Sequence, residues 1–256
     1  MKSRLNKLYS DNRKASARRF EVVAKDDANE VDIFLYDQIV SSEEEAEWWG
    51  GVAPESFVKA VYAVDKQATI NLRVNSPGGS VFAARAMEQA LRAHKGRVVV
   101  HIDGLAASAA TFIAMAGDEV IMSKGAMFMI HKAWTGMWGN AEDLRKEADL
   151  LDKIDGTLAE TYADKTGKDI AAIAEWMAAE TWFTAQEALD AGFATSIAEA
   201  EAKALAWDLS AYSNAPKAER QTQPEPAPTP EPEPTASDEH RDRQQQRLRV
   251  LSLLAA

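Results

Sequence analysis

The stretch DGLAASAATFIAMAGDEV, residues 103–120, holds a single serine, Ser108, among small and apolar residues. Most of the stretch is typical of a buried element in which only packing constrains the residue type. A serine with alanines on both sides has two interpretations. Its hydroxyl can bond a nearby carbonyl in a protein core, or its small neighbours can leave space around a reactive oxygen. The segments around Ser108 distinguish the two.

The chain around this stretch alternates between predicted strands and helices. Apolar runs bounded by Gly, Pro or Asp predict strands over residues 31–37, 69–75, 97–103, 119–123 and 126–131. Helical patterns lie between them, at residues 54–65, 80–94 and 106–116. Strands that alternate with crossover helices predict an α/β fold, with a largely parallel sheet covered on both faces.

Two further helices have boundaries marked by local signals. A long helix over 140–167 is expected to begin at Asn140 and to end at Gly167. A shorter one begins at a capping box, in which Thr184 and Glu187 satisfy each other's backbone N–H groups.

Charge and composition exclude several classes of function. The 256 residues carry a formal net charge of −11 and no cysteine. An acidic protein is poorly suited to the phosphate backbone of nucleic acids, and a chain without cysteine has no disulfide, thiolate nucleophile or cysteine-based metal site. No apolar window is long enough to cross a bilayer, and the basic N-terminus lacks the apolar stretch of a secretion signal. We therefore expect a soluble, cytoplasmic protein with no nucleic-acid or membrane partner.

The two ends of the chain differ in composition from its centre. Residues 1–30 begin with many basic side chains and are expected to form a mobile arm, whereas residues 31–212 are expected to form the folded domain. Seven of the nine prolines fall within residues 213–240, in alternation with Glu, which predicts an extended, disordered linker. Residues 241–256, basic and then apolar, are either a frayed end or a small docking helix.

A nucleophilic serine needs a base, and the usual base is histidine. The chain has four histidines. His240 lies in the predicted linker, His94 is at a polar helix end where it can cap carbonyls, and His101 sits inside a predicted strand. His131 ends the apolar run AMFMI, at the exit of a buried strand, where the sites of parallel sheets gather. His131 is therefore the best candidate.

An acyl-transfer site also needs hydrogen-bond donors for its oxyanion. The segment VNSPGGS, residues 74–80, follows a predicted strand and opens a helix. Its glycines let backbone N–H groups come close to a bound group, at a helix N-terminus that favours negative charge. The spacing is not that of a phosphate-binding loop, and Ala106 and Ala110 stand where the nucleophile elbow of α/β-hydrolases has glycines.

Three segments, NSPGGSVFAA, DGLAASAATFIAMAGDEVIM and MIHKA, in this order and spacing resemble the proteolytic subunit of the Clp protease family. They are most similar to the ClpP-related head maturation proteases of tailed bacteriophages. The resemblance runs from about residue 31 to residue 198. It implies a ClpP/crotonase-like spiral of ββα units, in which the helix over 140–167 is a handle that pairs subunits. It also implies Ser108 as nucleophile and His131 as general base, and we expect no cofactor and no metal.

The same resemblance implies where the oxyanion and the substrate bind. The oxyanion would be held by the backbone N–H groups of Gly79 and of Ala109, the residue after the serine. An extended peptide would lie beside the sheet, in a groove lined by Asn75, Ser76, Pro77 and Gly78. Backbone pairing would supply much of the binding.

The third member of the implied triad departs from the family pattern. Clp peptidases place an aspartate shortly before a segment like FTAQEA, and alignment without a gap puts Glu180 at that position. A glutamate is one methylene longer, but it can accept the imidazole N–H and hold the needed tautomer. Otherwise Glu180 is an exposed residue, and a water or a carbonyl orients His131. Asp103 and Asp118 are rivals, although each has the sequence context of a turn residue.

These assignments imply a serine endopeptidase that cleaves scaffold or capsid protein during procapsid assembly in the host cytoplasm. The expected partners are this protein or peptide substrate and further copies of the same chain, in a ring-forming oligomer.

Three alternatives stay open. Signal-peptide-peptidase-like enzymes share the fold and use a Ser–Lys dyad, in which Lys124 or Lys132 would be the base. Crotonase-type enzymes share the fold and the oxyanion hole but act on acyl-CoA without a serine nucleophile. A scaffold-associated protein that has lost activity is favoured if Glu180 does not orient His131.

Overall fold

The computed structural model describes residues 4–15, 18–25, 29–201 and 207–216. All of them belong to one compact unit, Met1–Pro216. The unit extends past the boundary expected at residue 212, because the backbone of Ser213 and Asn214 still bonds a side chain of the domain. The rest of the predicted linker and the segment 241–256 lie outside the described residues.

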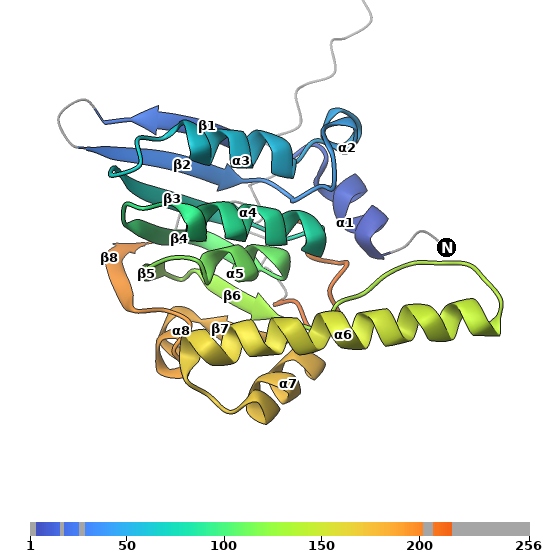
Figure 1. Ribbon diagram of the computed structural model, residues 1–256. Coiled ribbons are helices and arrows are strands. Elements are labelled where there is room, and N and C mark those ends of the chain that lie inside the picture. Colours follow the sequence, from blue (N-terminus) through green and yellow to red (C-terminus); the bar gives the residue numbers. More distant parts are fainter. Residues whose placement is uncertain (1–3, 16–17, 26–28, 202–206, 217–256) are drawn as a thin grey trace, which may run out of the picture. The chain divides into compact units, whose positions relative to one another are not determined.

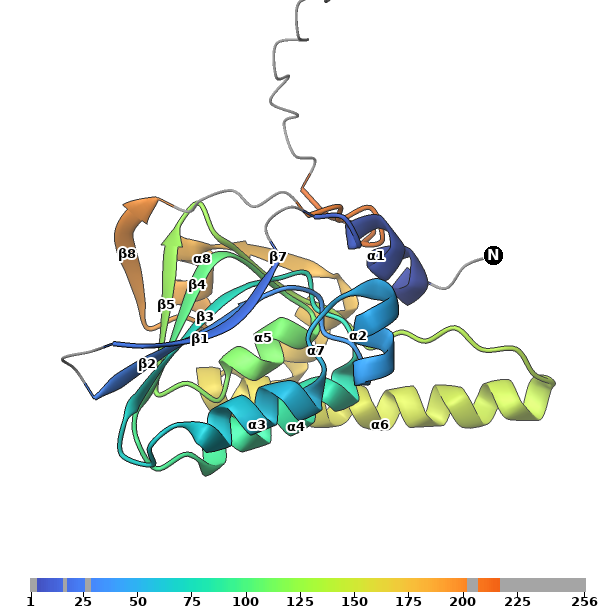
Figure 2. The same cartoon turned by 90° about the horizontal axis from the view of Figure 1, so that it is seen from above.

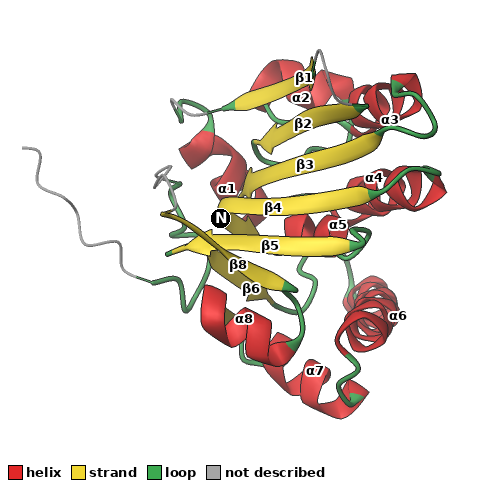
Figure 3. Ribbon diagram, turned by 90° about the vertical axis from the view of Figure 1, so that its left-hand side faces the viewer, coloured by secondary structure: helices red, strands yellow, loops and turns green. Residues whose placement is uncertain are grey.

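A mixed sheet forms the centre of this unit (Figures 1 and 3). Its strands follow the order β1-β2-β3-β4-β5-β8, and β6 pairs with both β4 and β7. The pairs from β2 through β8 along this path are parallel, as is β4 with β6, whereas β1 and β7 are antiparallel to their neighbours. The strands are β1 (Arg19–Ala24), β2 (Glu30–Tyr36), β3 (Thr69–Ser76), β4 (Val98–Ala107), β5 (Glu119–Lys124), β6 (Met127–Ile130), β7 (Thr181–Thr184) and β8 (Ser196–Glu201).

Helices α3 (Pro54–Ala63), α4 (Val81–Ala93) and α5 (Ala109–Ala114) lie along one face of the sheet (Figure 2). The side chains that meet between these layers are apolar and fully buried, among them Leu72, Val100, Ile102, Phe57, Met87 and Phe112. The remaining helices are α1 (Arg4–Asn12), α2 (Glu43–Trp49), α6 (Ala141–Thr166), α7 (Ile170–Ala178) and α8 (Ala185–Ala191).

The opposite face of β3 and β4 is polar around Arg73 and His101, and α1 covers only the end of β4 at Leu105 and Ala107, so the expectation that helices cover both faces holds only in part. Arg73 and His101 are paired across these strands, and Arg73 Nη2 lies 2.7 Å from Asp103 Oδ1. Because successive side chains of a strand point to opposite faces, these polar residues alternate with the apolar ones that face the helices.

The candidate nucleophile stands at a boundary that sequence patterns place differently. A helix over 106–116 is expected, but β4 continues to Ala107 and α5 begins at Ala109. Ala106 and Ala107 pair with Phe128 and Met129 of β6, and this ladder extends the strand. Alanine favours a helix over a strand, so the tertiary pairing with β6 overrides the local propensity here.

The long helix α6 has the expected boundaries. Asn140 and Asp143 form a capping box at its start, and Gly167 ends it with a φ of 67°. Its C-terminal half packs on the domain through Leu158 and Tyr162, whereas its N-terminal half runs past the body of the unit (Figure 1). Among the described helices, none combines the length and the apolar character needed to cross a bilayer.

The described parts of the predicted N-terminal arm are folded, so the structure differs from a mobile arm there. Residues 4–12 form α1, whose Leu8 and Tyr9 are buried. The Tyr9 hydroxyl donates a hydrogen bond of 2.7 Å to the carbonyl of Ile39. Residues 19–24 form β1, which pairs with β2 along its whole length. These contacts are with residues distant in the sequence, so the basic composition of the segment does not predict them.

Candidate active site

Ser108 occupies a sharp turn between β4 and α5. Its backbone has φ 54° and ψ −124°, and only 9% of the residue's surface is exposed. In the described part of the chain, Ser108 and Glu180 are the two non-glycine residues with positive φ. Such conformations cost about 1–3 kcal/mol and gather at functional sites. Both residues were singled out by the sequence for the same site.

His131 meets Ser108 because their strands are neighbours. It follows the last residue of β6, and β6 pairs with β4 so that Ala107 lies opposite Met129. The Ser108 N–H also donates to the Met129 carbonyl at 2.8 Å. As a result, Ser108 Oγ lies 2.7 Å from His131 Nε2. This is the geometry of a nucleophile and its general base.

The surroundings of His131 favour a neutral imidazole. Trp134 and Tyr212 make T-shaped contacts with its ring, and their ring centroids lie 5.1 Å and 5.4 Å from that of the imidazole. Desolvation lowers the pKa of His131 to about 4, while the charge of Glu180 acts to raise it and that of Arg4 to lower it. A neutral Nε2 can accept the proton of the serine hydroxyl.

The Gly-Gly loop after β3 packs directly on the serine. A Cβ on Gly78 would lie 2.5 Å from the Ala107 carbonyl oxygen and 2.9 Å from Ser108 Cβ. A Cβ on Gly79 would lie 1.9 Å from the Ile39 carbonyl oxygen. Neither contact is possible for a larger residue, so both glycines are required by close approach as well as by their positive φ.

Gly79 and Ala109 were expected to supply the N–H groups that hold an oxyanion. Gly79 bridges to Ile39 through its neighbours, because Ile39 N–H donates to the Gly78 carbonyl and Ser80 N–H donates to the Ile39 carbonyl. In such a parallel bridge the N–H of Gly79 points away from Ile39. Ala109 is the first residue of α5, where a helix leaves its N–H groups without internal partners. Both groups can serve an oxyanion.

The residues expected to line a peptide groove are not open to solvent. Asn75 and Ser76 are fully buried, and Ser76 Oγ accepts the Gly78 N–H at 3.1 Å. The Asn75 side-chain carbonyl accepts a hydrogen bond of 3.2 Å from Trp207 Nε1. The Pro77 carbonyl accepts one of 2.5 Å from the Tyr212 hydroxyl. Residues after the last strand therefore cover this edge.

Glu180 lies at the site but bonds other groups than His131. It precedes β7, and its residue is 9% exposed. Its carboxylate accepts the backbone N–H of Ser213 at 3.0 Å and of Asn214 at 2.6 Å. Within the described residues, no hydrogen bond joins Glu180 to the imidazole, although its charge acts on the His131 pKa. The structure thus brings Glu180 to the site without completing a hydrogen-bonded triad.

The rival carboxylates have structural partners elsewhere. Asp103 pairs with Arg73 and accepts from the Tyr36 hydroxyl at 2.5 Å on the polar face of the sheet. Asp118 accepts the Val98 N–H at 2.8 Å, which ties a turn to the start of β4.

The alternative bases are also engaged elsewhere or exposed. Lys132 is half-exposed, and its Nζ lies 3.9 Å from Asp155 Oδ2. Lys124 is exposed at the end of β5. Neither lysine bonds Ser108. His94 Nε2 bonds the Ala68 carbonyl at 2.7 Å, as expected of a histidine that caps carbonyls.

Sequence patterns missed the aromatic residues of the site. Trp134 and Tyr212 stack on each other at 5.3 Å and enclose the imidazole. Tyr212 was expected only as the last residue of the domain, and it carries no motif. Its partner Pro77 lies 135 positions away, so no local signal could have placed it at the site.

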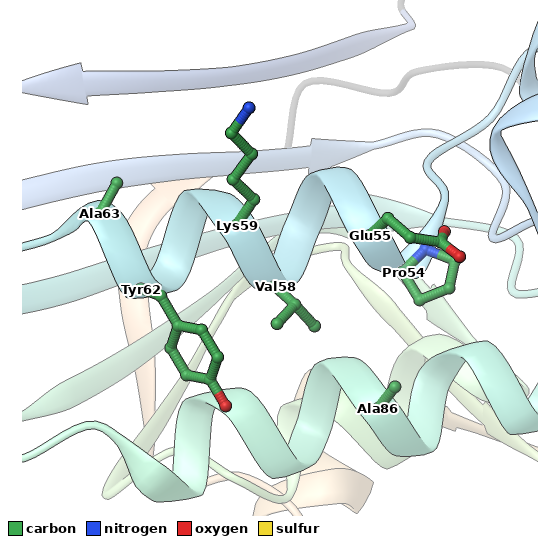
Figure 4. Close-up of a pocket in the computed structure, with 7 residues that line it drawn as sticks. All are labelled: Pro54, Glu55, Val58, Lys59, Tyr62, Ala63 and Ala86. Atoms are coloured by element: carbon green, nitrogen blue, oxygen red, sulfur yellow. The ribbon is translucent and has the colours of Figure 1, made fainter.

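A hollow of about 750 Å³ opens elsewhere, between α3 and α4 (Figure 4). It is lined by α3 residues together with Ala86 of α4, and no serine or histidine lines it. Within the described ranges, no three His, Asp or Glu side chains are grouped to hold a metal ion.

The chain is similar in sequence to known proteins of one family. The family model described as Clp protease matches residues 27–201. The ATP-dependent Clp protease proteolytic subunit 1 of Leifsonia xyli is 34% identical over 139 residues, which cover 54% of this chain and 71% of that protein. The corresponding subunit of Streptococcus agalactiae is 36% identical over 141 residues, covering 54% and 72%. Subunit 3 of Rhodococcus jostii is 31% identical over 157 residues, covering 60% and 75%.

The fold, the serine–histidine pair and these matches agree. The chain belongs to the Clp protease family, as a serine peptidase of the ClpP type.

Proposed function

We propose that Ser108 is the nucleophile of this peptidase and His131 its general base. The observation that carries the proposal is the 2.7 Å separation of Ser108 Oγ from His131 Nε2, beside an imidazole that burial keeps neutral. His131 takes the hydroxyl proton as Oγ attacks a peptide carbonyl. It then gives that proton to the leaving amine, and water later hydrolyses the acyl-enzyme.

The backbone N–H groups of Gly79 and Ala109 hold the oxyanion in this proposal. The loss of one such donor costs about 3–4 kcal/mol of transition-state stabilisation in comparable sites. The alanines around Ser108 leave room for the scissile carbonyl. Glu180 is proposed as the third member, which orients the imidazole once its carboxylate is free of Ser213 and Asn214.

Covalent labelling tests this assignment. The protein is incubated to completion with a fluorophosphonate, and its intact mass is measured. Wild type should gain one adduct on Ser108, whereas Ser108→Ala should gain none. Ser123→Ala is the matched control, because Ser123 has the same exposed fraction of 9% but lies on β5. An adduct on Ser108→Ala, or none on wild type, would contradict the proposal.

We further propose that the substrate is scaffold or capsid protein, cleaved inside an assembling procapsid in the host cytoplasm. The support is the similarity of DGLAASAA and its neighbours to phage head maturation proteases, together with the Pro/Glu-rich segment after the domain. Co-expression with the neighbouring capsid and scaffold genes tests it. Mass spectrometry should find shortened capsid or scaffold chains with wild type and full-length chains with Ser108→Ala. Full-length chains in both would contradict the role.

A homo-oligomer, in the form of a ring, belongs to the same proposal. The projecting half of α6 and the loop before it expose Leu144, Leu150 and Trp138, with 49%, 41% and 87% exposed. Apolar side chains of this size on a projecting helix suit a contact with a second copy. Light scattering should give a mass several times that of one chain, and a stable monomer at high concentration would contradict it.

A further inference from the structure

The site described above is occupied by the chain itself. Residues 207–214, here called the covering segment, follow the last strand and lie beside α1 (Figure 2). Ala211 and Tyr212 are its buried residues, whereas Asp208, Ser210, Ser213 and Asn214 are exposed. Tyr212 is its one buried large side chain, and Trp207 and Leu209 are partly buried against the same apolar cluster.

Tyr212 reaches the nucleophile. Its ring packs edge-on against His131 and stacks on Trp134. Burial raises the pKa of the Tyr212 hydroxyl, and a hydrogen bond with Ser108 acts in the opposite direction. The same hydroxyl donates to the Pro77 carbonyl at 2.5 Å. The phenol thus bonds the loop that precedes the proposed oxyanion donor, and Ser108 is close enough to act on its pKa.

A substrate needs the space that Tyr212 fills. For attack, a scissile carbonyl carbon must come within about 3–3.5 Å of Ser108 Oγ. The Tyr212 ring packs on His131, the partner of Ser108, and its hydroxyl bonds the adjacent loop, so the side chain fills the space through which a peptide carbonyl would approach. The segment is therefore placed as an inhibitor of the site.

The covering segment also holds Glu180. The N–H groups of Ser213 and Asn214 each bond one oxygen of its carboxylate. Within the described residues, the carboxylate is bonded to this segment and not to the imidazole. One segment thus withholds the nucleophile from substrate and the carboxylate from the base.

The segment is tied down at a distance from the reacting atoms. The Asn12 side chain of α1 donates to the Asp208 carbonyl at 2.9 Å and accepts the Asp208 N–H at 2.8 Å. Lys7 of α1 bonds Ser210 in addition. Both α1 and the covering segment lie outside residues 27–201, the part of the chain that matches the Clp protease family. The cover is an addition to the shared catalytic domain.

We propose that the covering segment keeps the peptidase closed, with Tyr212 as its inhibitory side chain, and that the segment must leave before substrate enters. This inference rests on the proposed role of Ser108 as nucleophile. The segment has no strand or helix pairing, and Asp208, Ser210, Ser213 and Asn214 are exposed, so it opens at lower cost than a strand or helix of the core.

The test measures the rate at which a fluorophosphonate labels full-length protein. Tyr212→Ala should be labelled at least about 10-fold faster than wild type, because it removes the buried ring that closes the site. Asn12→Ala should also be faster, although it touches none of the reacting residues. Tyr62→Ala is the matched control, since Tyr62 is 68% exposed on α3, and it should match wild type. Tyr212→Ala combined with Ser108→Ala should not be labelled.

The outcomes separate this inference from the proposed function. Equal rates for wild type, Tyr212→Ala and Asn12→Ala, with the adduct on Ser108, would overturn the closed state and leave the serine peptidase intact. Absence of any adduct in folded variants would overturn the proposed nucleophile. If Tyr212→Ala does not fold, Asn12→Ala decides the matter, because it keeps Tyr212 and removes the two hydrogen bonds that tie Asp208 to α1. Faster labelling of Asn12→Ala supports the inference, and a rate equal to that of wild type overturns it.

Discussion

The carboxylate of Glu180 accepts the backbone N–H of Asn214 at 2.6 Å, while its charge still acts to raise the pKa of His131. The residue is therefore close enough to influence the base, and its hydrogen bonds are used by another part of the chain. The proposed role of Glu180 in orienting the imidazole follows from this position.

Glu180→Gln should lower kcat strongly, by up to about 10⁴-fold, because a neutral amide does not stabilise the correct tautomer or the imidazolium. The loss of the negative charge should also move the acid limb of the activity profile to lower pH. Glu180→Asp keeps the charge and should retain more activity. Peptide hydrolysis against pH measures all three proteins. Equal kcat and an unmoved acid limb in Glu180→Gln would show that another group orients His131.

The buried state of His131 predicts how stability depends on pH. In the unfolded chain the imidazole has its ordinary pKa near 6.5, and in the folded protein the pKa is about 4. The unfolded state therefore binds a proton first as the pH falls. The free energy of unfolding is therefore not reduced by His131 above the unfolded pKa. It falls as the pH is lowered from about 6.5 to about 4, because the unfolded state takes up the proton.

Urea unfolding at pH 7 and pH 5 measures this effect. Wild type should lose more unfolding free energy between the two than His131→Gln, which has no imidazole to protonate. The same loss in both proteins would contradict a neutral, buried His131.

Gly79→Ala should destabilise the fold by about 3 kcal/mol or more, since its Cβ would lie 1.9 Å from the Ile39 carbonyl oxygen. Gly125→Ala is a matched control. Gly125 has a φ of 80°, but a Cβ there would have no neighbour within 4 Å. It should cost only the backbone strain of about 1 kcal/mol. Chemical denaturation compares the two, and equal losses would mean that the contact with Ile39 can relax.

The long helix α6 is linked to Ser108 by two buried hydrogen bonds. The Tyr162 and Thr111 hydroxyls lie 2.8 Å apart, and Thr111 donates to the Ser108 carbonyl at 2.6 Å. Tyr162→Phe should therefore lower the unfolding free energy by about 1 kcal/mol. Tyr62→Phe, at an exposed tyrosine, should leave it unchanged. An unchanged midpoint for Tyr162→Phe would show that the bond contributes nothing net.

The sequence predicts the parts of this structure that depend on local pattern. The strands before and after Ser108, the boundaries of α6 and the Gly-Gly loop follow from periodicity, caps and turn residues. The meeting of Ser108 with His131 also follows, because adjacent parallel strands bring their carboxyl ends together.

The parts that were missed depend on distant contacts. Tyr9 is buried where it bonds Ile39, and Tyr212 where it bonds Pro77. No neighbouring residue in the sequence predicts either contact. The end of β4 at Ala107 likewise depends on pairing with β6. Alanines and single tyrosines fit many environments, so only the folded chain assigns them one.

Asn12 and Asp208, which bond each other, are 196 positions apart in the chain. During translation, Ser108, His131 and Glu180 leave the ribosome before Asp208 does. Under the proposed closure, a chain that ends shortly after residue 201 therefore has the proposed catalytic residues but not their cover. Restraint of the site would then be acquired only when synthesis of the chain passes residue 214.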